Sequence, residues 1–319
     1  IILEGLSLRA SGVLSLYNSN DGTFYDRSTW NGNTSNGMGI VSNSKSTYAQ
    51  NTNMLTYNKS FNGRHKDDHK LTVTLVQEQS ATNSYSSTIV AQNFLIQQTN
   101  IDDLGGASKL TSSSSRSKRV LLSYLGRINY SFEGKYFLTA SYRADGSSVF
   151  GVNNKWGKFP SAALAWRASE EEFIKDLGFI SNLKFRGTWG VTGNQAINAY
   201  QTLASLRSGQ NYAYDGGDGM LIGLAISRLP NPGLKWESTE QYDVGMDLGF
   251  FNNRLTFTAD YYKKTTTDLL LNRSLPGYVG LTSIISNVGS MGNRGVELAV
   301  GGDPLVGKFK WHTGFNISF

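Results

Sequence analysis

The sequence predicts an all-β fold, an antiparallel transmembrane β-barrel, from three observations: composition, alternation of apolar and polar residues, and uneven connection lengths. Charged residues make up 17% of the 319 residues and aromatic residues 12%, with 35 glycines and 5 prolines. Soluble domains carry about 25% charged residues, and Tyr, Phe and Thr favour strands. The longest nearly unbroken apolar run, residues 220–226, is far shorter than the ~20 residues of a transmembrane helix.

Alternation is the main signal for strands, because successive side chains point to opposite faces of a strand. In residues 122–132, one face carries Leu122, Tyr124, Gly126, Ile128, Tyr130 and Phe132. The opposite face carries Ser123, Leu125, Arg127, Asn129 and Ser131. A tight turn at residues 133–135 and a second alternating segment from Tyr136 complete a predicted β-hairpin.

The same pattern recurs along the chain and predicts about eleven strands. It is clearest in four further segments, residues 183–192, 241–250, 255–262 and 309–319. It is weaker in three earlier segments, residues 3–17, 46–61 and 71–93. One helix is predicted over residues 169–180, where Ser169 and Glu172 have the spacing of a capping box.

The connections between these segments differ strongly in length. Short links are expected at residues 133–135, 251–254 and 302–307. Long links are expected at residues 18–45, 94–118, 146–157, 193–235 and 271–290. In an up-and-down order, all long links lie at one end of the sheet, and the short links and the predicted helix lie at the other. Long extracellular loops and short periplasmic turns are typical of outer-membrane barrels.

The character of the two strand faces favours a membrane barrel over a soluble sandwich. The polar face is mostly Thr, Ser, Asn and Gly, with a minority of charges. Aromatic residues gather at predicted strand ends, as in the girdles of such barrels: Tyr130, Phe132, Tyr136, Phe137, Phe250, Phe251 and Phe257. From the pattern alone, a soluble all-β array is the alternative.

The charge and the cysteine content narrow the possible partners and chemistry. The net charge is +6, but Lys and Arg are scattered, and the densest cluster (Arg116, Lys118, Arg119) follows a serine run that is typical of a solvated loop. With no nucleic-acid-binding motif, we expect no nucleic-acid partner. The absence of cysteine excludes disulfides and thiolate chemistry. The first residue is Ile1 rather than Met, so the natural N-terminus is expected to lie upstream.

Five segments resemble the SusC/RagA-type TonB-dependent outer-membrane transporters of Bacteroidota, and they occur in the family's order. The resemblance is strong from about residue 121 to residue 298. The segments are LLSYLGRINYSFEGKYFLTASYRADGSSVFG (121–151), NKWGKFPSAALAWRASEEEFIKD (154–176), GVTGNQAINAY (190–200), NPGLKWESTEQYDVGMDLGFFNNRLTFTADYYKKTTTDLLL (231–271) and SNVGSMGNRGVEL (286–298).

This resemblance implies a gated importer in the outer membrane, a barrel plugged by an N-terminal domain and opened through TonB. It also implies a SusD-type surface lipoprotein as partner and an oligosaccharide, or sometimes a peptide, as cargo. Plugged barrels have about 22 strands. Residues 1–319 are therefore expected to be part of the barrel domain of a TonB-dependent receptor, with the N-terminal plug and the C-terminal strands absent.

Candidate metal and catalytic residues are few. His65, Asp67, Asp68 and His69 are possible ligands, but they fall in a predicted turn and lack the HExxH pattern, so a solvated turn is favoured. Residues 215–219, DGGDG, offer oxygen ligands for Ca²⁺ without the bidentate Glu of an EF-hand, and a loop tip is favoured. No nucleophile elbow occurs. We expect no catalytic residue, metal or cofactor.

Two groups of residues are candidates for lining the transport route. Seven are expected on a polar wall facing the lumen, because Arg or Lys on the lipid face would cost ~2–4 kcal/mol each near the midplane: Arg127, Arg143, Asp145, Arg186, Asp243, Asp247 and Asp260. For Arg127, Arg143, Asp145 and Arg186, mutual pairing or contact with a plug is favoured over lining the route of a polar cargo. Four loop aromatics are the best candidates for ligand contact, although packing within their loops or a place in the outer girdle is favoured for each: Trp156, Tyr212, Tyr214 and Trp236.

The sequence therefore predicts a chain that forms part of an importer's membrane wall, embedded in outer-membrane lipid and without enzymatic activity. Two other functions stay open from the residues alone. One is a surface or secreted β-protein that binds glycans, and the other is an outer-membrane enzyme with its site among the loops.

Overall fold

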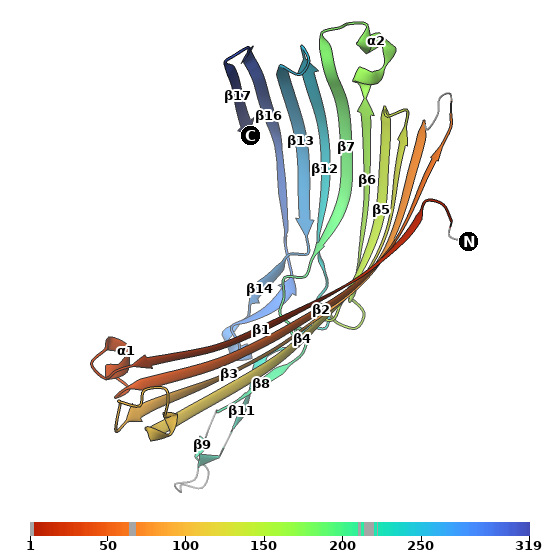
Figure 1. Ribbon diagram of the computed structural model, residues 1–319. Helices are drawn as coiled ribbons and strands as arrows, with labels where there is room; N and C mark the ends of the chain where they lie inside the picture. Colours follow the sequence, from red (N-terminus) through yellow and green to blue (C-terminus); the bar gives the residue numbers. More distant parts are fainter. Residues whose placement is uncertain (1–2, 64–67, 210–211, 214–219, 222) are drawn as a thin grey trace. The chain divides into compact units, whose positions relative to one another are not determined.

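The computed structural model describes residues 3–63, 68–209, 212–213, 220–221 and 223–319. Strands dominate it, and eleven of them form one sheet in the order β1-β2-β3-β4-β5-β6-β7-β12-β13-β16-β17 (Figure 1). Their bounds are β1 (Leu6–Tyr25), β2 (Met38–Phe61), β3 (His69–Phe94), β4 (Ala107–Phe132), β5 (Tyr136–Ser147), β6 (Trp156–Arg167), β7 (Ile180–Asn194), β12 (Glu237–Phe250), β13 (Leu255–Thr267), β16 (Ser290–Val306) and β17 (Lys310–Ser318).

The remaining elements lie in the connections. Three small antiparallel pairs are β8 (Ser205–Ser208) with β11 (Leu224–Arg228), β9 (Tyr212–Ala213) with β10 (Met220–Leu221), and β14 (Leu270–Ser274) with β15 (Ser283–Asn287). The helical segments are α1 (Trp30–Asn33), α2 (Glu172–Lys175) and three 3₁₀ turns, η1 (Leu104–Gly106), η2 (Ala168–Glu170) and η3 (Gly277–Val279). Within the described ranges, no helix is both long and apolar enough to cross a membrane.

The predicted alternation of short and long connections is confirmed. Short turns join β4 to β5 and β12 to β13, whereas residues 195–236 and 268–289 carry the small strand pairs. In the first turn, Glu133 (φ 51°) and Gly134 (φ 66°) are both left-handed, as a two-residue hairpin loop of type I′ requires. In the second turn, Phe251, Asn252 and Asn253 have φ between 53° and 62°. Asn tolerates this region better than most residues.

Three predictions about element bounds are wrong. The short link predicted at residues 302–307 lies at residues 307–309, because β16 extends to Val306 and β17 begins at Lys310. The first strands extend well into the predicted loops at residues 18–45 and 94–118, because β1 ends at Tyr25, β2 begins at Met38 and β4 begins at Ala107. The serine run and Arg116 thus lie in β4, where the guanidinium sits 5.5 Å from the ring centre of Tyr85. Polar residues on both faces had hidden the strand pattern.

The predicted helix at residues 169–180 is also much shorter than expected. Its first part is the 3₁₀ turn η2, and α2 has four residues with Glu171 as N-cap. The carboxylate of Glu171 makes no capping hydrogen bond, because it accepts hydrogen bonds from Tyr136, Lys135 and Trp166. Gly178, with φ of 67°, follows the helix, and β7 begins at Ile180.

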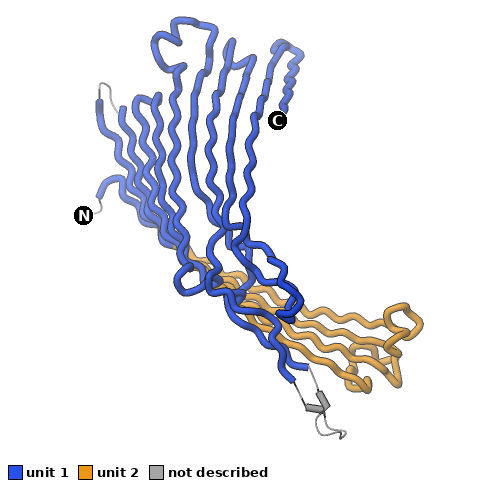
Figure 2. Tube along the Cα trace, turned by 180° about the vertical axis from the view of Figure 1, so that it is seen from behind, with its two compact units in different colours: residues 1–10, 53–77, 122–319 blue, residues 11–52, 78–121 orange. Residues whose placement is uncertain are grey.

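The chain divides into two compact units (Figure 2). Unit 1 contains residues 1–10, 53–77 and 122–319, and unit 2 contains residues 11–52 and 78–121. Unit 2 has a small core of Ala91, Phe94 and Ala107, on which Phe24 and Leu104 pack. In unit 1, buried apolar residues such as Phe150, Leu234 and Trp236 belong to the connections and strand ends. Among the residues that the structure describes, the long strands of unit 1 therefore do not enclose a hydrophobic core of their own.

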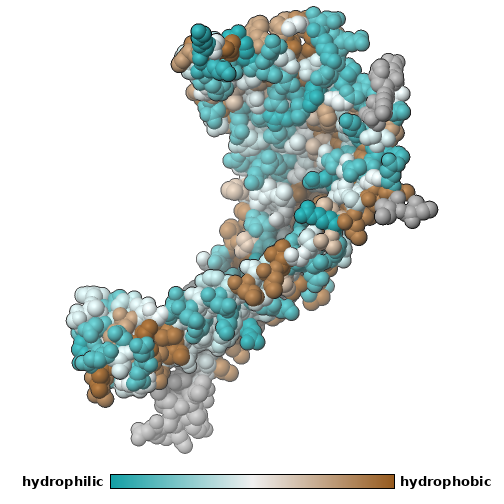
Figure 3. Space-filling view, in the orientation of Figure 1, coloured by the Kyte–Doolittle hydropathy of each residue, from teal (hydrophilic) through white to brown (hydrophobic). Residues whose placement is uncertain are grey.

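Strand register in unit 1 separates an apolar face from a polar face, as the alternation predicts. On one face, Leu138, Leu164, Gly187 and Val244 are opposed in successive strands. On the other face, Ala165, Arg186, Gly245 and Asp260 are opposed in the same way. The side of unit 1 visible in Figure 3 is dominated by hydrophilic residues.

Candidate functional site

The polar face of unit 1 carries an ion-pair cluster across three adjacent strands. Register places Arg186 of β7 opposite Gly245 of β12, and Gly245 opposite Asp260 of β13. Asp243 and Asp247 flank Gly245 at two residues on either side, so they share its face. The sequence assigns these four charged residues to one face, and the strand register explains why they meet.

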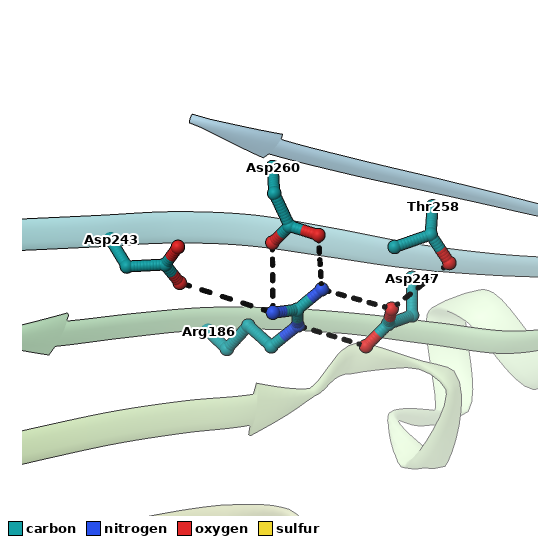
Figure 4. Close-up of polar contacts among 5 residues, drawn as sticks. All are labelled: Arg186, Asp243, Asp247, Thr258 and Asp260. Carbon is teal, nitrogen blue, oxygen red and sulfur yellow. Dashed lines mark hydrogen bonds and ion pairs between the residues drawn. The ribbon is translucent and has the colours of Figure 1, made fainter. Parts of the chain in front are cut away.

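The guanidinium of Arg186 contacts all three carboxylates (Figure 4). It forms a two-point contact with Asp260, with Nη1–Oδ1 at 2.8 Å and Nη2–Oδ2 at 2.9 Å. It forms a second with Asp247, with Nε–Oδ2 at 3.2 Å and Nη2–Oδ1 at 3.3 Å. The Nη1–Oδ1 distance to Asp243 is 3.9 Å. The planar fork of arginine matches carboxylates in this two-point manner.

Gly245 makes this geometry possible. A Cβ atom at residue 245 would lie 2.2 Å from Oδ1 of Asp260 and 2.7 Å from Cζ of Arg186. The arginine side chain therefore crosses β12 over the space that any other residue would fill. Sequence reasoning missed Gly245, although a glycine between two aspartates on a polar strand face was a usable signal.

The cluster carries excess negative charge. Three carboxylates against one guanidinium leave a formal charge of −2, and the side chains are partly shielded, with 17% of Asp260 and 29% of Arg186 exposed. Glu297 of β16 lies directly opposite Asp260. Beside them is a polar hollow of ≈ 280 Å³. Such a surface attracts cationic groups and repels anionic ones.

The other predicted wall residues lie apart from this cluster. Nε of Arg143 is 2.9 Å from Oδ2 of Asp145, two residues along β5, and Asp145 is buried. Arg127 of β4 is exposed and forms no ion pair with any residue that the structure describes. Asn129, two residues further, accepts a hydrogen bond from Thr139, a residue of the polar face of β5. Alternation thus puts Arg127 on the polar face as well.

The predicted ligand-contacting aromatics have different environments. Trp236 is buried against Phe150 and Phe159, with ring centres 5.1 Å and 5.5 Å away, and its indole N–H donates to the carbonyl of Lys155. Trp236 therefore packs inside the protein, against Phe150 and Phe159, where the connections meet the strand ends. Trp156 is half exposed and stacks on Tyr124 of the apolar face. That position suits an outer aromatic girdle. Tyr212 lies in β9, and Tyr214 and the side chain of Tyr212 fall outside the described residues.

The metal candidates are only partly described. His65, Asp67 and residues 215–219 fall outside the described residues. His69 begins β3, stacks on Phe61 and forms a 2.7 Å hydrogen bond between Nδ1 and the hydroxyl of Tyr130. In the part of the chain that is described, no group of three or more His, Cys, Asp or Glu residues could hold a metal ion.

Comparison with a family model gives a match over nearly the whole chain. Residues 4–319 match the model described as TonB dependent receptor-like, beta-barrel. Two curated proteins are similar as well. TonB-dependent receptor P3 of Formosa agariphila is 35% identical over 318 residues, which are 99% of this chain and 31% of that protein. TonB-dependent receptor SusC of Bacteroides thetaiotaomicron is 39% identical over 208 residues, 63% of this chain and 20% of that protein.

Solved structures agree with the sequence comparison. The RagAB peptide importer in its closed-closed state is similar with a TM-score of 0.87 and 26% identity, covering 100% of this chain and 34% of that chain. The RagAB peptide transporter gives a TM-score of 0.83 over 99% of this chain and 35% of that chain, at 26% identity. The chain thus spans about a third of the length of the first of these curated relatives and of each of these solved structures.

Proposed function

The chain belongs to the β-barrel family of TonB-dependent receptors, and from this premise we propose that it forms the wall and outer mouth of an importer. Members of this family, of which SusC is one, are bacterial outer-membrane β-barrels and are not enzymes. The proposed cargo is an oligosaccharide or a peptide. The secreted-protein and enzyme alternatives from the sequence are thereby set aside.

One observation carries this proposal: the two faces of the unit 1 sheet have opposite chemistry and opposite exposure. On the apolar face, Val244 and Leu164 are 63% and 62% exposed. On the other face, charges such as Arg186 and Asp260 are paired and partly shielded. An apolar, core-free face suits lipid, and a polar face suits a hydrated lumen. We propose that Arg127, Arg143, Asp145 and the Arg186 cluster face this lumen.

Two partners complete the proposal. TonB would supply energy from the inner membrane, as the family name implies, and a SusD-type lipoprotein would cover the outer mouth. The similarity to the RagAB peptide importer supports a peptide as one cargo class. The resemblance of the five sequence segments to SusC/RagA-type transporters supports an oligosaccharide as the other cargo class.

We also propose that the natural protein contributes further strands and a plug. The main sheet begins at β1 and ends at β17, so each of these strands has one neighbour in the sheet order. An unpaired strand edge in lipid costs several kcal/mol for each unsatisfied backbone group. Additional strands that pair with β1 and β17 would close the barrel.

Arginine substitutions on the two faces test the lipid-facing assignment. Leu248→Arg and Val244→Arg place a charge on the apolar face. An arginine side chain that faces lipid near the bilayer midplane costs ~2–4 kcal/mol. Thr256→Arg places the same charge on the polar face. Thr256 lies opposite Gly249, the residue after Leu248, so the two sites are at a similar height in the sheet. We expect folded protein in outer-membrane fractions to fall several-fold for the first two variants and little for the third. Equal loss for all three would contradict the assignment.

An uptake assay tests the transport proposal itself. Cells that lack the gene are complemented with the natural protein, and uptake of fluorescent oligosaccharides and peptides is compared. We expect one cargo class to accumulate, and accumulation to stop when TonB is deleted. Uptake that is unchanged by deletion of the gene would contradict the proposal, as would uptake that is independent of TonB.

A further inference from the structure

The β14–β15 hairpin leaves the main sheet at two residues with a left-handed backbone conformation. Asp268 (φ 57°) follows β13, and Gly289 (φ 78°) precedes β16. The pairing of β13 with β16 lies on one side of these residues, and the pairing of β14 with β15 lies on the other. Residues at the ends of elements are the ones that absorb backbone rotation when a segment turns. The base of the hairpin is therefore a point at which it could turn relative to the sheet.

The side chain of Asn287 joins this base to the connection between β7 and β12. Its Nδ2 donates to the carbonyl of Lys235, and its Oδ1 accepts from the N–H of the same residue, both at 2.9 Å. Nδ2 also donates to the carbonyl of Asp268 at 2.9 Å. A neighbouring antiparallel strand exchanges the same two hydrogen bonds with a residue that it faces. The amide of Asn287 therefore takes the place of a strand beside Lys235.

Two further contacts join the hairpin to the same connection. Nδ2 of Asn231 donates to the carbonyl of Ile285 at 2.8 Å. Nζ of Lys235 lies 2.7 Å from Oδ2 of Asp268, in an ion pair whose side chains are 50% and 37% exposed. Exposed ion pairs contribute little stability, so the hydrogen bonds of Asn231 and Asn287 are the main link. Both side chains bind backbone groups and thus fix the course of the chain.

Residues 231–236, to which the hairpin is joined, are also fixed to the connection between β5 and β6. Nδ2 of Asn154 donates to the carbonyl of Gly233 at 3.2 Å. Trp236 is buried, and its Nε1 donates to the carbonyl of Lys155 at 2.9 Å. The segment therefore has a packed position of its own, and Asn287 ties the hairpin to it.

We propose that Asn287 acts as a latch between the β14–β15 hairpin and residues 231–236, so that the two segments keep one arrangement and open only together. Without this side chain, the hairpin could turn at Asp268 and Gly289 while residues 231–236 stay in place. Both segments belong to the long connections, which form the outer mouth in the proposed function. The latch itself needs only the folded chain, so its test does not depend on the transport of a cargo.

Hydrogen exchange followed by mass spectrometry tests the latch, with the natural protein folded in detergent. Asn287→Ala removes the hydrogen bonds to Lys235 and Asp268. We expect amide exchange to become about tenfold faster in the peptides that cover residues 231–236 and in those that cover the hairpin. Tenfold corresponds to about 1.4 kcal/mol, the net contribution of one or two hydrogen bonds. Unchanged exchange in residues 231–236 would overturn the proposal, because Asn287 would then act on its own hairpin alone.

Asn272→Ala is the matched control on the same hairpin. Asn272 lies on β14, is exposed, and its side chain forms no hydrogen bond with any residue that the structure describes. We expect exchange in residues 231–236 to stay as in the unchanged protein. Acceleration equal to that of Asn287→Ala would contradict the latch, because the loss of any amide side chain from the hairpin would then loosen the connection.

A measurement on the unchanged protein avoids dependence on folding of the variants. Exchange is followed at increasing urea concentrations below the global unfolding transition, where segments that open as one unit lose protection together. We expect residues 231–236 and β15 to lose protection at the same urea concentration. Loss of protection in one of the two at a clearly lower concentration than in the other would show that they open separately, and the proposal would fall.

Discussion

Among individual residues, Gly245 shows how the absence of a side chain fixes the geometry of the polar face. It lies beneath the guanidinium of Arg186, where a Cβ would approach Asp260 to 2.2 Å. Gly245→Ala should displace Arg186 and lower the free energy of unfolding by about 1–3 kcal/mol, the usual cost of overpacking. Urea unfolding in detergent, followed by the mobility shift of the folded barrel on gels, measures this change.

Gly187→Ala is the matched control for that substitution. Gly187 lies opposite Val244 on the adjacent strand, and a Cβ there meets no atom within 4 Å. We expect its unfolding free energy to stay within about 0.5 kcal/mol of the unchanged protein, as for most surface substitutions. Equal destabilisation by Gly245→Ala and Gly187→Ala would contradict this account. It would show that each glycine is needed for its backbone conformation, and not that Gly245 leaves space for the side chain of Arg186.

Arg186 itself is expected to contribute to stability through the three carboxylates around it. Arg186→Gln leaves Asp243, Asp247 and Asp260 without their cation. Removing one partner of a buried pair costs 3–5 kcal/mol, and because 29% of the Arg186 side chain is exposed, we expect a smaller loss of about 1–2 kcal/mol. Replacing Asp260 with Asn in the same variant should recover part of it. A loss that is no smaller in the double variant would contradict this account.

At the scale of elements, the connection from β6 to β7 shows where sequence patterns stop being sufficient. Ser169 and Glu172 have capping-box spacing, yet the helix begins after Glu171 and contains four residues. The carboxylate that could cap it is instead the acceptor for Tyr136, Lys135 and Trp166. Lys135 and Tyr136 come from the neighbouring β4–β5 hairpin, and sequence spacing cannot place them beside Glu171, whereas Trp166 lies near the end of β6, five residues before it.

These contacts predict a pH-dependent contribution of Glu171. Because hydrogen bonds from Tyr136, Lys135 and Trp166 lower its pKa below 4.5 in the folded protein, the stabilisation is present above about pH 4.5 and is lost as the pH falls through the folded value. Glu171→Gln should therefore lower the melting temperature at pH 7 and have less effect near pH 3. A difference that grows on acidification would contradict the assignment.

The strands themselves could be predicted to different extents. Alternation in residues 122–132 and 241–250 assigned the faces of β4 and β12, because one face is clearly apolar. In β1 and β2, Ser, Asn and Thr occupy both faces near Tyr25 and Met38, so the pattern did not reveal how far these strands extend. Backbone pairing with neighbouring strands extends them where side-chain contrast is absent.

At the scale of the whole molecule, the sequence predicted the eleven-stranded sheet and the alternation of long and short connections. It also assigned Arg186, Asp243, Asp247 and Asp260 to one face, but the contacts among them depend on register between β7, β12 and β13. Trp236 could not be placed from sequence, because its burial against Phe150 and Phe159 depends on connections far apart in the chain.

The central claim is that the apolar face of unit 1 contacts lipid and the polar face contacts water. Residues 1–319 contain no cysteine, so a single cysteine at each of residues 242–248, in natural protein with any cysteine elsewhere replaced by serine, can carry a nitroxide label in lipid vesicles. We predict that Tyr242, Val244, Met246 and Leu248 positions are accessible to oxygen, and that Asp243 and Asp247 positions are accessible to a water-soluble nickel complex. Accessibility without this two-residue alternation, or with the faces reversed, would contradict the account.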